Sequence, residues 1–382
     1  MYYKAIIHFL IMILSKKWGL KNVSFMKKIL LYILIIAAVA ACEPPEVGYI
    51  SDNIHALQDT VYVPRGVFTT SAAPSAEGST YPMHWQISSV TDEDGNPTDD
   101  LFDEYEILIW KEAFNGDTDT TLALAEAKLE LSEQPTLLIN EVSGEMAFTQ
   151  ASKYVTDNNI YKVNVNVSNV KGERQLDDFT VVKLEEFKAV DFTGEMRDRI
   201  YLIQDGERKT LYTSVIKNAD DDQIPSVLDG THPYITITKT SEEPSLGIKV
   251  KMIVTDSHDV PFSPEKVVDY IWNGSALQNY HDNSVETVED ATGTTFMLPA
   301  PPFPQFSRNN WGDLMYYRTT RDAFTVDKEA YEADFGPQDW SVYDVDPDTG
   351  EILCDAYLRW AIKIYDSGTW EIKMRIPYSK KL

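Results

Sequence analysis

Residues 357–376 read YLRWAIKIYDSGTWEIKMRI, and this stretch decides the fold that we predict for the second half of the chain. Apolar residues occupy every second position on both sides of the Asp366–Gly368 turn: Leu358, Trp360, Ile362 and Ile364 before it, and Trp370, Ile372, Met374 and Ile376 after it. Because successive side chains of a strand point to opposite faces, each half predicts a strand with one buried face. Two such strands around a short turn predict an antiparallel hairpin. We therefore expect a jelly-roll-like β-sandwich over residues 189–382.

Another alternating segment lies earlier in the chain, at Ile160–Asn166, and continues to Val167. Tyr and Val residues alternate there with polar ones, which predicts a strand with one apolar face. A turn leads from it to a return strand at residues 178–184. This pair resembles the closing hairpin of bacterial immunoglobulin-like (Ig-like) domains, although the chain lacks a Cys…Trp…Cys spacing. We expect an Ig-like β-sandwich over residues 61–188 and a boundary within residues 185–194, so the predicted fold class is all-β.

Two segments favour helices. Residues 121–132 are rich in Ala, Leu, Glu and Lys, and their apolar residues share a face at helical spacing, although a short strand with a loop remains an alternative. Residues 327–334 predict a single short helix. Cys354 lies in an apolar segment, which predicts a buried and inert thiol.

The segment Met26–Cys42, MKKILLYILIIAAVAAC, has the pattern of a secretory signal peptide, with two lysines, an apolar run and small residues in that order. Its apolar run, residues 29–41, is too short to span a bilayer. A cysteine directly after small residues resembles the lipobox of bacterial lipoproteins. That resemblance implies acylation of Cys42 and removal of residues 1–41.

Residues 1–25 hold a second apolar run. They are either a real extension or the result of a mis-assigned upstream start, and we favour the second, with translation beginning at Met26. Residues 42–60 then form a lipidated tether, in which prolines oppose regular structure. We expect a lipoprotein anchored to the outer membrane and exposed at the cell surface.

The charge of the chain excludes some partners. It carries 34 Lys and Arg residues against 60 Asp and Glu residues, a formal net charge of -26 at pH 7. Recognition of nucleic acid begins with a basic footprint, so we expect no nucleic-acid partner. The folded part is also a poor match for anionic lipid, which leaves the predicted acyl chains as the contact with the membrane.

No enzyme motif is present: the sequence lacks GxSxG, GxGxxG, a P-loop and HExxH. Its histidines show no metal-ligand spacing. With so many carboxylates, acid pairs of the kind that a glycosidase needs arise by chance, and the sequence singles out none. We therefore expect a binding protein rather than an enzyme, and no cofactor. A calcium ion is the alternative to this last expectation.

The calcium hypothesis rests on the loop DVDPDTG, in which Asp344, Asp346 and Asp348 recur at alternate positions. Carboxylates in this pattern supply the oxygen ligands that calcium prefers, and Asp355 falls at the twelfth place of such a loop. However, Gly350 stands one position later than in a calcium loop. The same residues fit an ordinary turn, in which proline fixes φ and glycine adopts the left-handed region. We favour the turn and keep calcium as the alternative.

Aromatic residues gather between residues 303 and 343, several of them beside amides and carboxylates. Flat apolar rings flanked by hydrogen-bonding groups are typical of sugar-binding platforms. The alternative for each single ring is a place in the core. The residues that we single out as a candidate ligand site are Trp311 with Asn309 and Asn310, and Trp340 with Gln338 and Asp339.

Residues 66–70 (GVFTT), 79–82 (STYP), 109–111 (IWK) and 368–378 resemble a family of uncharacterised Bacteroidetes lipoproteins that is classed as a domain of unknown function. The similarity covers nearly all of residues 60–382. Members look like companions of SusC/SusD-type glycan-uptake systems. The resemblance therefore implies a surface glycan-binding accessory protein with polysaccharide and SusC/SusD-like partners, and it supplies no catalytic residues. The alternative is a structural or adhesive lipoprotein that binds protein partners.

Overall fold

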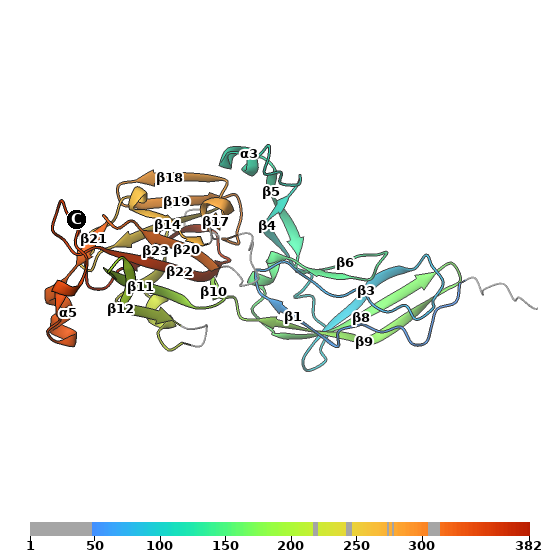
Figure 1. Cartoon of the computed structure of the whole chain (residues 1–382). Coiled ribbons are helices and arrows are strands. Elements are labelled where there is room, and N and C mark those ends of the chain that lie inside the picture. Colours follow the sequence, from blue (N-terminus) through green and yellow to red (C-terminus); the bar gives the residue numbers. More distant parts are fainter. Residues whose placement is uncertain (1–47, 217–220, 242–246, 273–274, 277–278, 305–313) are drawn as a thin grey trace, which may run out of the picture.

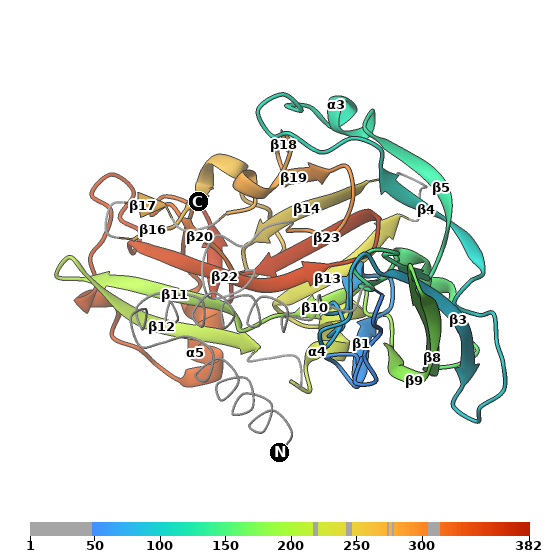
Figure 2. The same ribbon diagram turned by 90° about the vertical axis from the view of Figure 1, so that its right-hand side faces the viewer.

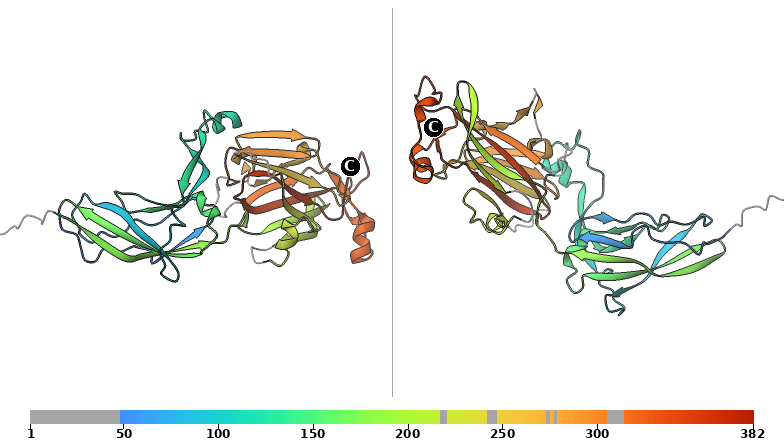
Figure 3. Two further views of the ribbon diagram at one scale, coloured as in Figure 1. Left: turned by 180° about the vertical axis from the view of Figure 1, so that it is seen from behind. Right: turned by 60° about the horizontal axis from the view of Figure 1, so that its bottom comes forward.

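The computed structural model describes residues 48–216, 221–241, 247–272, 275–276, 279–304 and 314–382. The predicted signal peptide, Cys42, Asn309, Asn310 and Trp311 lie outside these residues. Figure 1 shows the described part as β-sandwiches placed end to end, and the further views in Figure 3 agree. The predicted all-β fold class is confirmed. Among the described residues, no helix is both long and apolar enough to cross a bilayer.

The first sandwich holds the blue to green part of the chain in Figure 1. Its elements are β1 (Thr60–Pro64), β2 (Thr69–Thr70), β3 (His84–Asp92), β4 (Glu104–Trp110), α3 (Leu122–Glu126), β5 (Leu129–Pro135), β6 (Leu137–Ile139), β7 (Met146–Phe148), η1 (Gln150–Tyr154), β8 (Ile160–Asn169) and β9 (Gly172–Glu185). One sheet has the order β1-β9-β8-β3, with β1 parallel to β9, and the other has the order β2-β7-β6. This pairing is that of Ig-type sandwiches. The predicted strands at residues 160–166 and 178–184 are confirmed as a pair, β8 and β9.

Two buried side chains stand where Ig-type sandwiches carry their signature residues. Trp85 lies on β3 with 1% of its surface exposed, and its ring centroid is 6.1 Å from that of Phe179. Tyr161 lies near the start of the neighbouring strand β8, and its hydroxyl is 3.0 Å from Oδ2 of Asp100 and 3.3 Å from the carbonyl oxygen of Asn158. A tyrosine that bonds back to the preceding chain is the tyrosine corner of this fold. The sandwich thus keeps its architecture with no disulfide among the described residues.

The helix predicted over residues 121–132 is wrong for its second half. Helix α3 is a single short turn, and its N-cap Thr121 accepts a hydrogen bond from the backbone N–H of Leu124. Strand β5 begins at Leu129 and pairs along its whole length with β4. Tertiary pairing therefore overrides the helix propensity of these residues. The β4–β5 ribbon reaches towards the second sandwich, where the backbone N–H of Leu122 donates to Glu286 at 3.2 Å (Figure 2).

The second sandwich holds the remaining strands. Its elements are β10 (Val190–Phe192), β11 (Met196–Gln204), β12 (Glu207–Ile216), α4 (Ile224–Leu228), β13 (Ile235–Ser241), β14 (Ile248–Thr255), η2 (Pro264–Lys266), β15 (Val267–Asp269), β16 (Ile271–Trp272), β17 (Ser275–Ala276), η3 (His281–Asn283), β18 (Glu286–Asp290), β19 (Gly293–Leu298), β20 (Leu314–Thr319), β21 (Phe324–Val326), α5 (Lys328–Phe335), η4 (Trp340–Val342), β22 (Cys354–Ile364), β23 (Gly368–Arg375) and β24 (Ser379–Lys381). One sheet has the order β12-β11-β22-β20-β15, with β10 also on β22, and the facing sheet has the order β13-β23-β14-β19-β18. The short helix predicted at residues 327–334 is confirmed as α5.

The strands predicted from residues 357–376 exist, but the predicted hairpin is wrong. Strand β22 pairs with β11 and β20, whereas β23 pairs with β13 and, in parallel, with β14. The bend Asp366–Gly368 carries the chain from one sheet to the facing sheet. Alternation of apolar residues shows that one face of a strand is buried, but two strands on opposite sides of a core carry the same pattern as a hairpin. Gly368 fits this bend because its φ is +112°, in the left-handed region.

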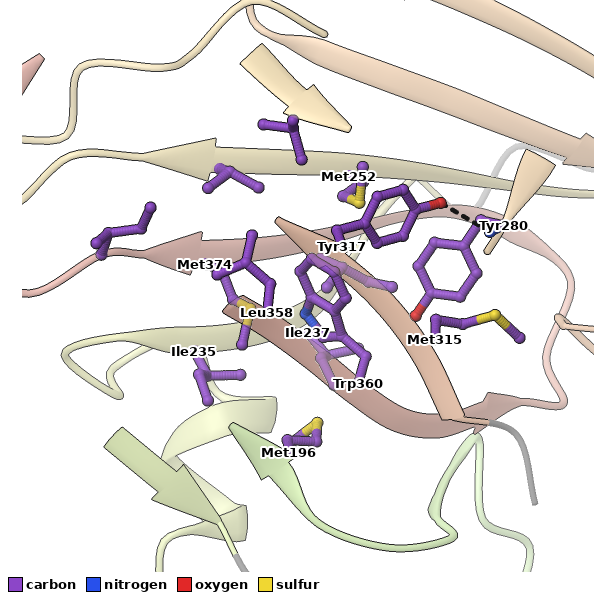
Figure 4. Packing of buried hydrophobic residues seen from close by; sticks show 14 of the residues in the cluster. Met196, Ile235, Ile237, Met252, Tyr280, Met315, Tyr317, Leu358, Trp360 and Met374 are labelled. Carbon is purple, nitrogen blue, oxygen red and sulfur yellow. Dashed lines mark hydrogen bonds between the residues drawn. The ribbon is translucent and has the colours of Figure 1, made fainter. Parts of the chain in front are cut away.

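The core between the two sheets is dense and aromatic (Figure 4). Trp360 of β22 and Tyr317 of β20 pack with ring centroids 5.4 Å apart, and both are fully buried. The hydroxyl of Tyr317 accepts a hydrogen bond of 2.7 Å from the backbone N–H of Tyr280. Cys354 is also fully buried, as predicted, and burial raises the pKa of its thiol well above the ordinary value. This core is separate from that of the first sandwich.

Ion pairs link the two sandwiches at the Asp366 bend. Nζ of Lys153, on η1 of the first sandwich, lies 2.7 Å from Oδ1 of Asp366, and Nζ of Lys239, on β13, lies 2.8 Å from Oδ2. Lys153 also lies 4.5 Å from the ring centroid of Phe187 in the connection between the sandwiches. The hydrophobic clusters fall on either side of residues 185–189. The domain limits 61–188 and 189–382 remain a prediction.

One buried group works against the stability of the second core. Asp198 of β11 faces inwards between Met196 and Ile200, is fully buried, and has no hydrogen-bond partner for either carboxyl oxygen within the described residues. Burial raises the pKa of Asp198 well above its ordinary value. The neutral acid is therefore the form that the folded state holds.

This burial predicts a stability difference that grows with pH. Above about pH 4 the unfolded chain ionises Asp198 while the folded chain keeps the proton, so stability falls as pH rises towards the folded pKa. Asp198→Asn removes this loss, and we expect it to gain about 1 to 3 kcal/mol at pH 7 and little at pH 4. Urea unfolding of residues 43–382, monitored by tryptophan fluorescence, measures the free energy of unfolding at pH 7 and at pH 4. Asp290→Asn is the control: Asp290 is exposed and paired with Lys251, so its replacement gives no such gain. Equal stability of Asp198→Asn and the parent at pH 8 would contradict the assignment.

Candidate functional site

The outer face of the β11–β22–β20 sheet carries an unusual set of side chains. Alternate residues of these strands are buried in the core, and the residues between them are partly exposed on the opposite face. A hollow of about 250 Å³ opens there. We call the outward side chains around it the Tyr–Arg face: Arg197, Arg199, Tyr201, Tyr270, Tyr316, Arg318, Tyr357 and Arg359.

The strand register places arginine and tyrosine side by side across this face. In one row Arg197 of β11 lies opposite Arg359 of β22, which lies opposite Tyr316 of β20. In the next row Arg199 lies opposite Tyr357. Directly opposite residues of neighbouring strands have Cβ atoms about 5 Å apart, so these side chains form a continuous surface.

Tyr357 is the centre of the aromatic part. Its ring centroid is 4.5 Å from that of Tyr270 and 4.9 Å from that of Tyr201, both in edge-to-face geometry. The guanidinium of Arg208, on β12, lies 4.9 Å from the same ring centroid. Burial, offset in part by Arg208, raises the pKa of Tyr357 to about 12. The hydroxyl is therefore neutral at physiological pH and can both donate and accept a hydrogen bond.

The carboxylates near this face are held by arginines. Asp355 is 1% exposed and accepts hydrogen bonds from Nε of Arg208 at 3.0 Å and from Nη2 at 2.7 Å. Glu195 lies 3.0 Å from Nη1 of Arg197 and 3.5 Å from Nη1 of Arg359. The hydrogen bonds to Asp355 fix the guanidinium of Arg208 in place, whereas Oε1 of Glu195 attracts its two arginines by charge and has no hydrogen-bond partner among the described residues.

Several polar atoms of the face are left without a partner. Nε of Arg318, Nε of Arg359 and the hydroxyl of Tyr316 are buried, and none of them has a hydrogen-bond partner in the part of the chain that the structure describes. Buried polar groups are normally bonded, so an unpaired set marks a place where water or a ligand completes the bonding. Arg199 bonds only to neutral groups, Thr213 at 3.3 Å and the hydroxyl of Tyr201 at 3.4 Å. The geometry thus supplies rings for stacking and donors for an oxygen-rich ligand.

Other hollows are larger but offer less directed chemistry. One of about 670 Å³ lies between the sandwiches, and two of its charged groups, Lys153 and Asp366, already pair with each other. Another of about 480 Å³ lies along the connection between β9 and β10, against Phe187, Ile237 and Trp370. We place the candidate site on the Tyr–Arg face because it alone of these hollows joins aromatic rings with the unpaired donors described above.

The sequence pointed to different residues. Trp340 is partly buried against the second core, its Nε1 donates to Oε1 of Glu332 at 2.6 Å, and its ring centroid is 5.6 Å from that of Tyr331. The side chain of Gln338 donates to the hydroxyl of Tyr343 at 2.9 Å, and Asp339 accepts from the backbone N–H and the hydroxyl of Ser341. The polar groups of these three predicted residues are therefore engaged within the chain. Asn309, Asn310 and Trp311 lie outside the described residues, so their role stays a prediction.

The aspartates of the calcium hypothesis serve backbone turns. Asp344 accepts hydrogen bonds from the backbone N–H groups of Asp205 and Gly206, at 3.1 and 2.8 Å. Asp346 accepts from the backbone N–H groups of Asp348 and Thr349, both at 2.9 Å. No group of three or more His, Cys, Asp or Glu side chains among the described residues could hold a metal ion. These contacts fit the turn, and calcium binding by Asp344, Asp346 and Asp348 stays untested.

The Tyr–Arg face was missed by sequence reasoning, although a signal for it exists. In the RDRIY segment that starts at Arg197 and the YLR segment that starts at Tyr357, arginine and tyrosine occupy the outward positions. These residue types are unusual together on a solvent-facing strand, where Lys, Glu and Thr are the ordinary choices. Their meeting across three strands required the sheet order, which the local pattern does not contain.

The comparisons with known proteins give no family. No protein-family model and no curated protein matches the chain. Among solved structures, it is similar to a SusE-like surface-located polysaccharide-binding protein from the Bacteroides thetaiotaomicron heparin utilisation locus, at 8% identity and a TM-score of 0.21, covering 85% of this chain and 54% of that one. It is also similar to the N-terminal four Ig domains of Dscam1 isoform 9.44, at 9% identity and a TM-score of 0.19, covering 86% and 74%. Scores this low carry no argument about function. The chain spans about half the length of the SusE-like structure.

The contacts of Trp340 predict its role in stability. We expect Trp340→Ala to lower the free energy of unfolding by about 1 to 2 kcal/mol, a loss of several degrees in Tm, because the ring packs against Tyr331 and the second core. Trp340→Phe keeps an aromatic ring but loses the bond to Glu332 and part of the packing area, so the expected decrease in stability is smaller. Differential scanning calorimetry of residues 43–382 measures both, with the exposed Val142→Ala as control. An unchanged Tm for Trp340→Ala would mean that the ring is free and would restore it as a ligand-binding candidate.

Proposed function

We propose that this protein is a non-catalytic glycan-binding lipoprotein of the cell surface, and that the Tyr–Arg face holds the glycan. The observation that carries the proposal is the presence of tyrosine rings on one face of the sheet together with donor groups that have no partner among the described residues, Nε of Arg318, Nε of Arg359 and the hydroxyl of Tyr316. A sugar offers an apolar C–H face and a rim of hydroxyls. Tyrosine rings can stack on the C–H face, and arginine N–H groups can donate hydrogen bonds to the hydroxyls.

The carboxylates beside the hollow support binding without chemistry. Glycoside hydrolysis needs one carboxyl that gives a proton and another that attacks or activates water. Asp355 is bound by Arg208 on both oxygens and is shielded from solvent, and Glu195 is shared by two arginines. Both carboxylates are therefore engaged by arginine side chains, which favours binding over hydrolysis.

The cellular setting of the proposal comes from the sequence. Acylation of Cys42 would tether the sandwiches to the outer membrane, and the acidic, hydrated surface suits exposure outside the cell. A surface glycan-binding protein of this kind fits an accessory role beside SusC/SusD-like proteins in polysaccharide uptake.

Replacement of the central ring tests the glycan proposal. We expect Tyr357→Leu, which keeps apolar bulk and removes the stacking ring, to weaken glycan binding about tenfold with little change in Tm. The measurement is affinity electrophoresis of residues 43–382 through a panel of polysaccharides, followed by calorimetric titration of any that retard the protein. Tyr62→Leu is the matched control, since Tyr62 is exposed on β1 of the other sandwich. If no glycan retards the folded protein, the proposal falls and the adhesive, protein-binding alternative takes its place.

Lipidation is tested on the intact gene product. Cys42→Ala should abolish incorporation of labelled palmitate and release the protein from the membrane fraction, because the acyl chains are the proposed attachment. The matched control is Cys354→Ala, whose thiol is buried in the folded protein and out of reach of an acyl donor. Unchanged labelling of Cys42→Ala would rule out the lipobox.

A further inference from the structure

The Tyr–Arg face holds more positive charge than its carboxylates balance. Within the described part of the chain, Glu195 pairs with Arg197 and Arg359, whereas Arg199 and Arg318 form no ion pair with a carboxylate. The chain as a whole has a formal net charge of -26, so this local excess runs against its composition. A cluster of guanidinium groups on an otherwise acidic protein indicates a specific role for positive charge at this face.

These charges also oppose one another. Arg197 lies opposite Arg359 in the sheet register, and Arg199 follows Arg197 by two positions on the same face. Burial first, and then the charges of Arg199 and Arg359, lower the pKa of Arg197 from its ordinary value. An anion placed among the three guanidinium groups would offset this repulsion and complete their hydrogen bonds.

The geometry fits an anion that is attached to a ring. Arg199 lies directly opposite Tyr357 across the β11–β22 ladder, and the guanidinium of Arg359 lies 5.8 Å from the ring centroid of Tyr316. A charged group held by the arginines would leave the body of its carrier beside a tyrosine ring. Carboxylate and sulfate share the oxygen geometry that a guanidinium fork binds in pairs.

We infer that the ligand of the Tyr–Arg face is an anionic saccharide, in which a uronate carboxylate or a sulfate group binds among Arg197, Arg199 and Arg359 while the sugar ring stacks on Tyr357. This inference rests on the proposed glycan-binding function and names the class of glycan. Arg318, which lies opposite Tyr357 across the β20–β22 ladder, would flank the same sugar.

The favoured carrier is a saccharide rather than nucleic acid or an acidic protein. A hollow of about 250 Å³ admits a unit of the size of a sugar ring with its substituent. A nucleic acid needs a long basic track for its phosphates, and the rest of this chain is acidic. An acidic peptide has carboxylates on mobile stems and no flat apolar face for Tyr357, and it serves below as a competing probe.

Pairs of charged and uncharged polysaccharides distinguish the contribution of the charge to binding from that of the sugar. Polygalacturonate and its fully methyl-esterified form share a backbone and differ only in the carboxylate charge, and dextran sulfate and dextran differ in the same way by sulfate. Polyglutamate supplies carboxylates without sugar. We expect residues 43–382 to bind polygalacturonate or dextran sulfate about tenfold or more tightly than the uncharged partner or polyglutamate. This binding should weaken as sodium chloride is raised, because salt screens exposed charges.

Arg199 is the residue to replace, since it has no carboxylate partner among the residues that the structure describes and its loss leaves none of them with an unpaired buried charge. Arg199→Gln should weaken binding of the charged polymer about tenfold without lowering Tm, and Arg199→Lys, which keeps the charge and loses the planar fork, should lie between. Arg174→Gln is the matched control, because Arg174 lies on β9 of the first sandwich.

Each outcome tests the anionic inference separately from the glycan proposal. Equal binding of the charged and uncharged polymers would overturn the anionic inference and leave the glycan proposal in place. Equal binding of polyglutamate, or an equal loss in Arg174→Gln, would show attraction to charge alone and would also overturn it. If neither charged polymer binds, the inference falls, and the wider polysaccharide panel then decides the glycan proposal separately.

Discussion

The pleat of β22 is the constraint on which the rest of the structure depends. Leu358, Trp360 and Ile362 point inwards and are almost completely buried, which fixes the register of β22 between β11 and β20. The same pleat turns Tyr357 and Arg359 outwards. A slip of one residue would exchange the two sets and bury the arginine. The alternation of side chains along β22 therefore determines both the packing of the core and the geometry of the Tyr–Arg face.

The bend at Asp366 connects the two sheets of the second sandwich and also contacts the first sandwich. It carries the chain from β22 across the core to β23, and its carboxylate receives Lys239 from the facing sheet and Lys153 from the first sandwich. One short segment thus closes the second sandwich and ties it to the Ig-type sandwich. Desolvation by itself raises the pKa of Asp366, but the two lysines outweigh it and the net shift is downwards. The carboxylate therefore stays charged and the link persists at neutral pH.

The proposed binding role depends on charge and burial together. The acidic surface repels polyanions in general, while the Tyr–Arg face concentrates guanidinium groups whose neighbouring carboxylates are already engaged. A rigid sheet can hold such side chains in place with little loss of freedom on binding. Loops are the commoner place for ligand contacts, but here the strands themselves present the rings and donors.

The sequence by itself determined the all-β class, the strands at residues 160–166 and 357–376, the buried thiol of Cys354 and the short helix α5, because periodicity and burial are local properties. The local pattern gave the pairing of β8 with β9 correctly, but the hairpin that it predicted at Asp366 was wrong. It also did not show that Leu129, predicted as helix, would pair with β4 as the start of a strand. The Tyr–Arg face was decided by the tertiary structure alone. Its side chains come from strands that are far apart in the sequence, and only the order β11-β22-β20 brings Arg199, Tyr357 and Tyr316 onto one surface.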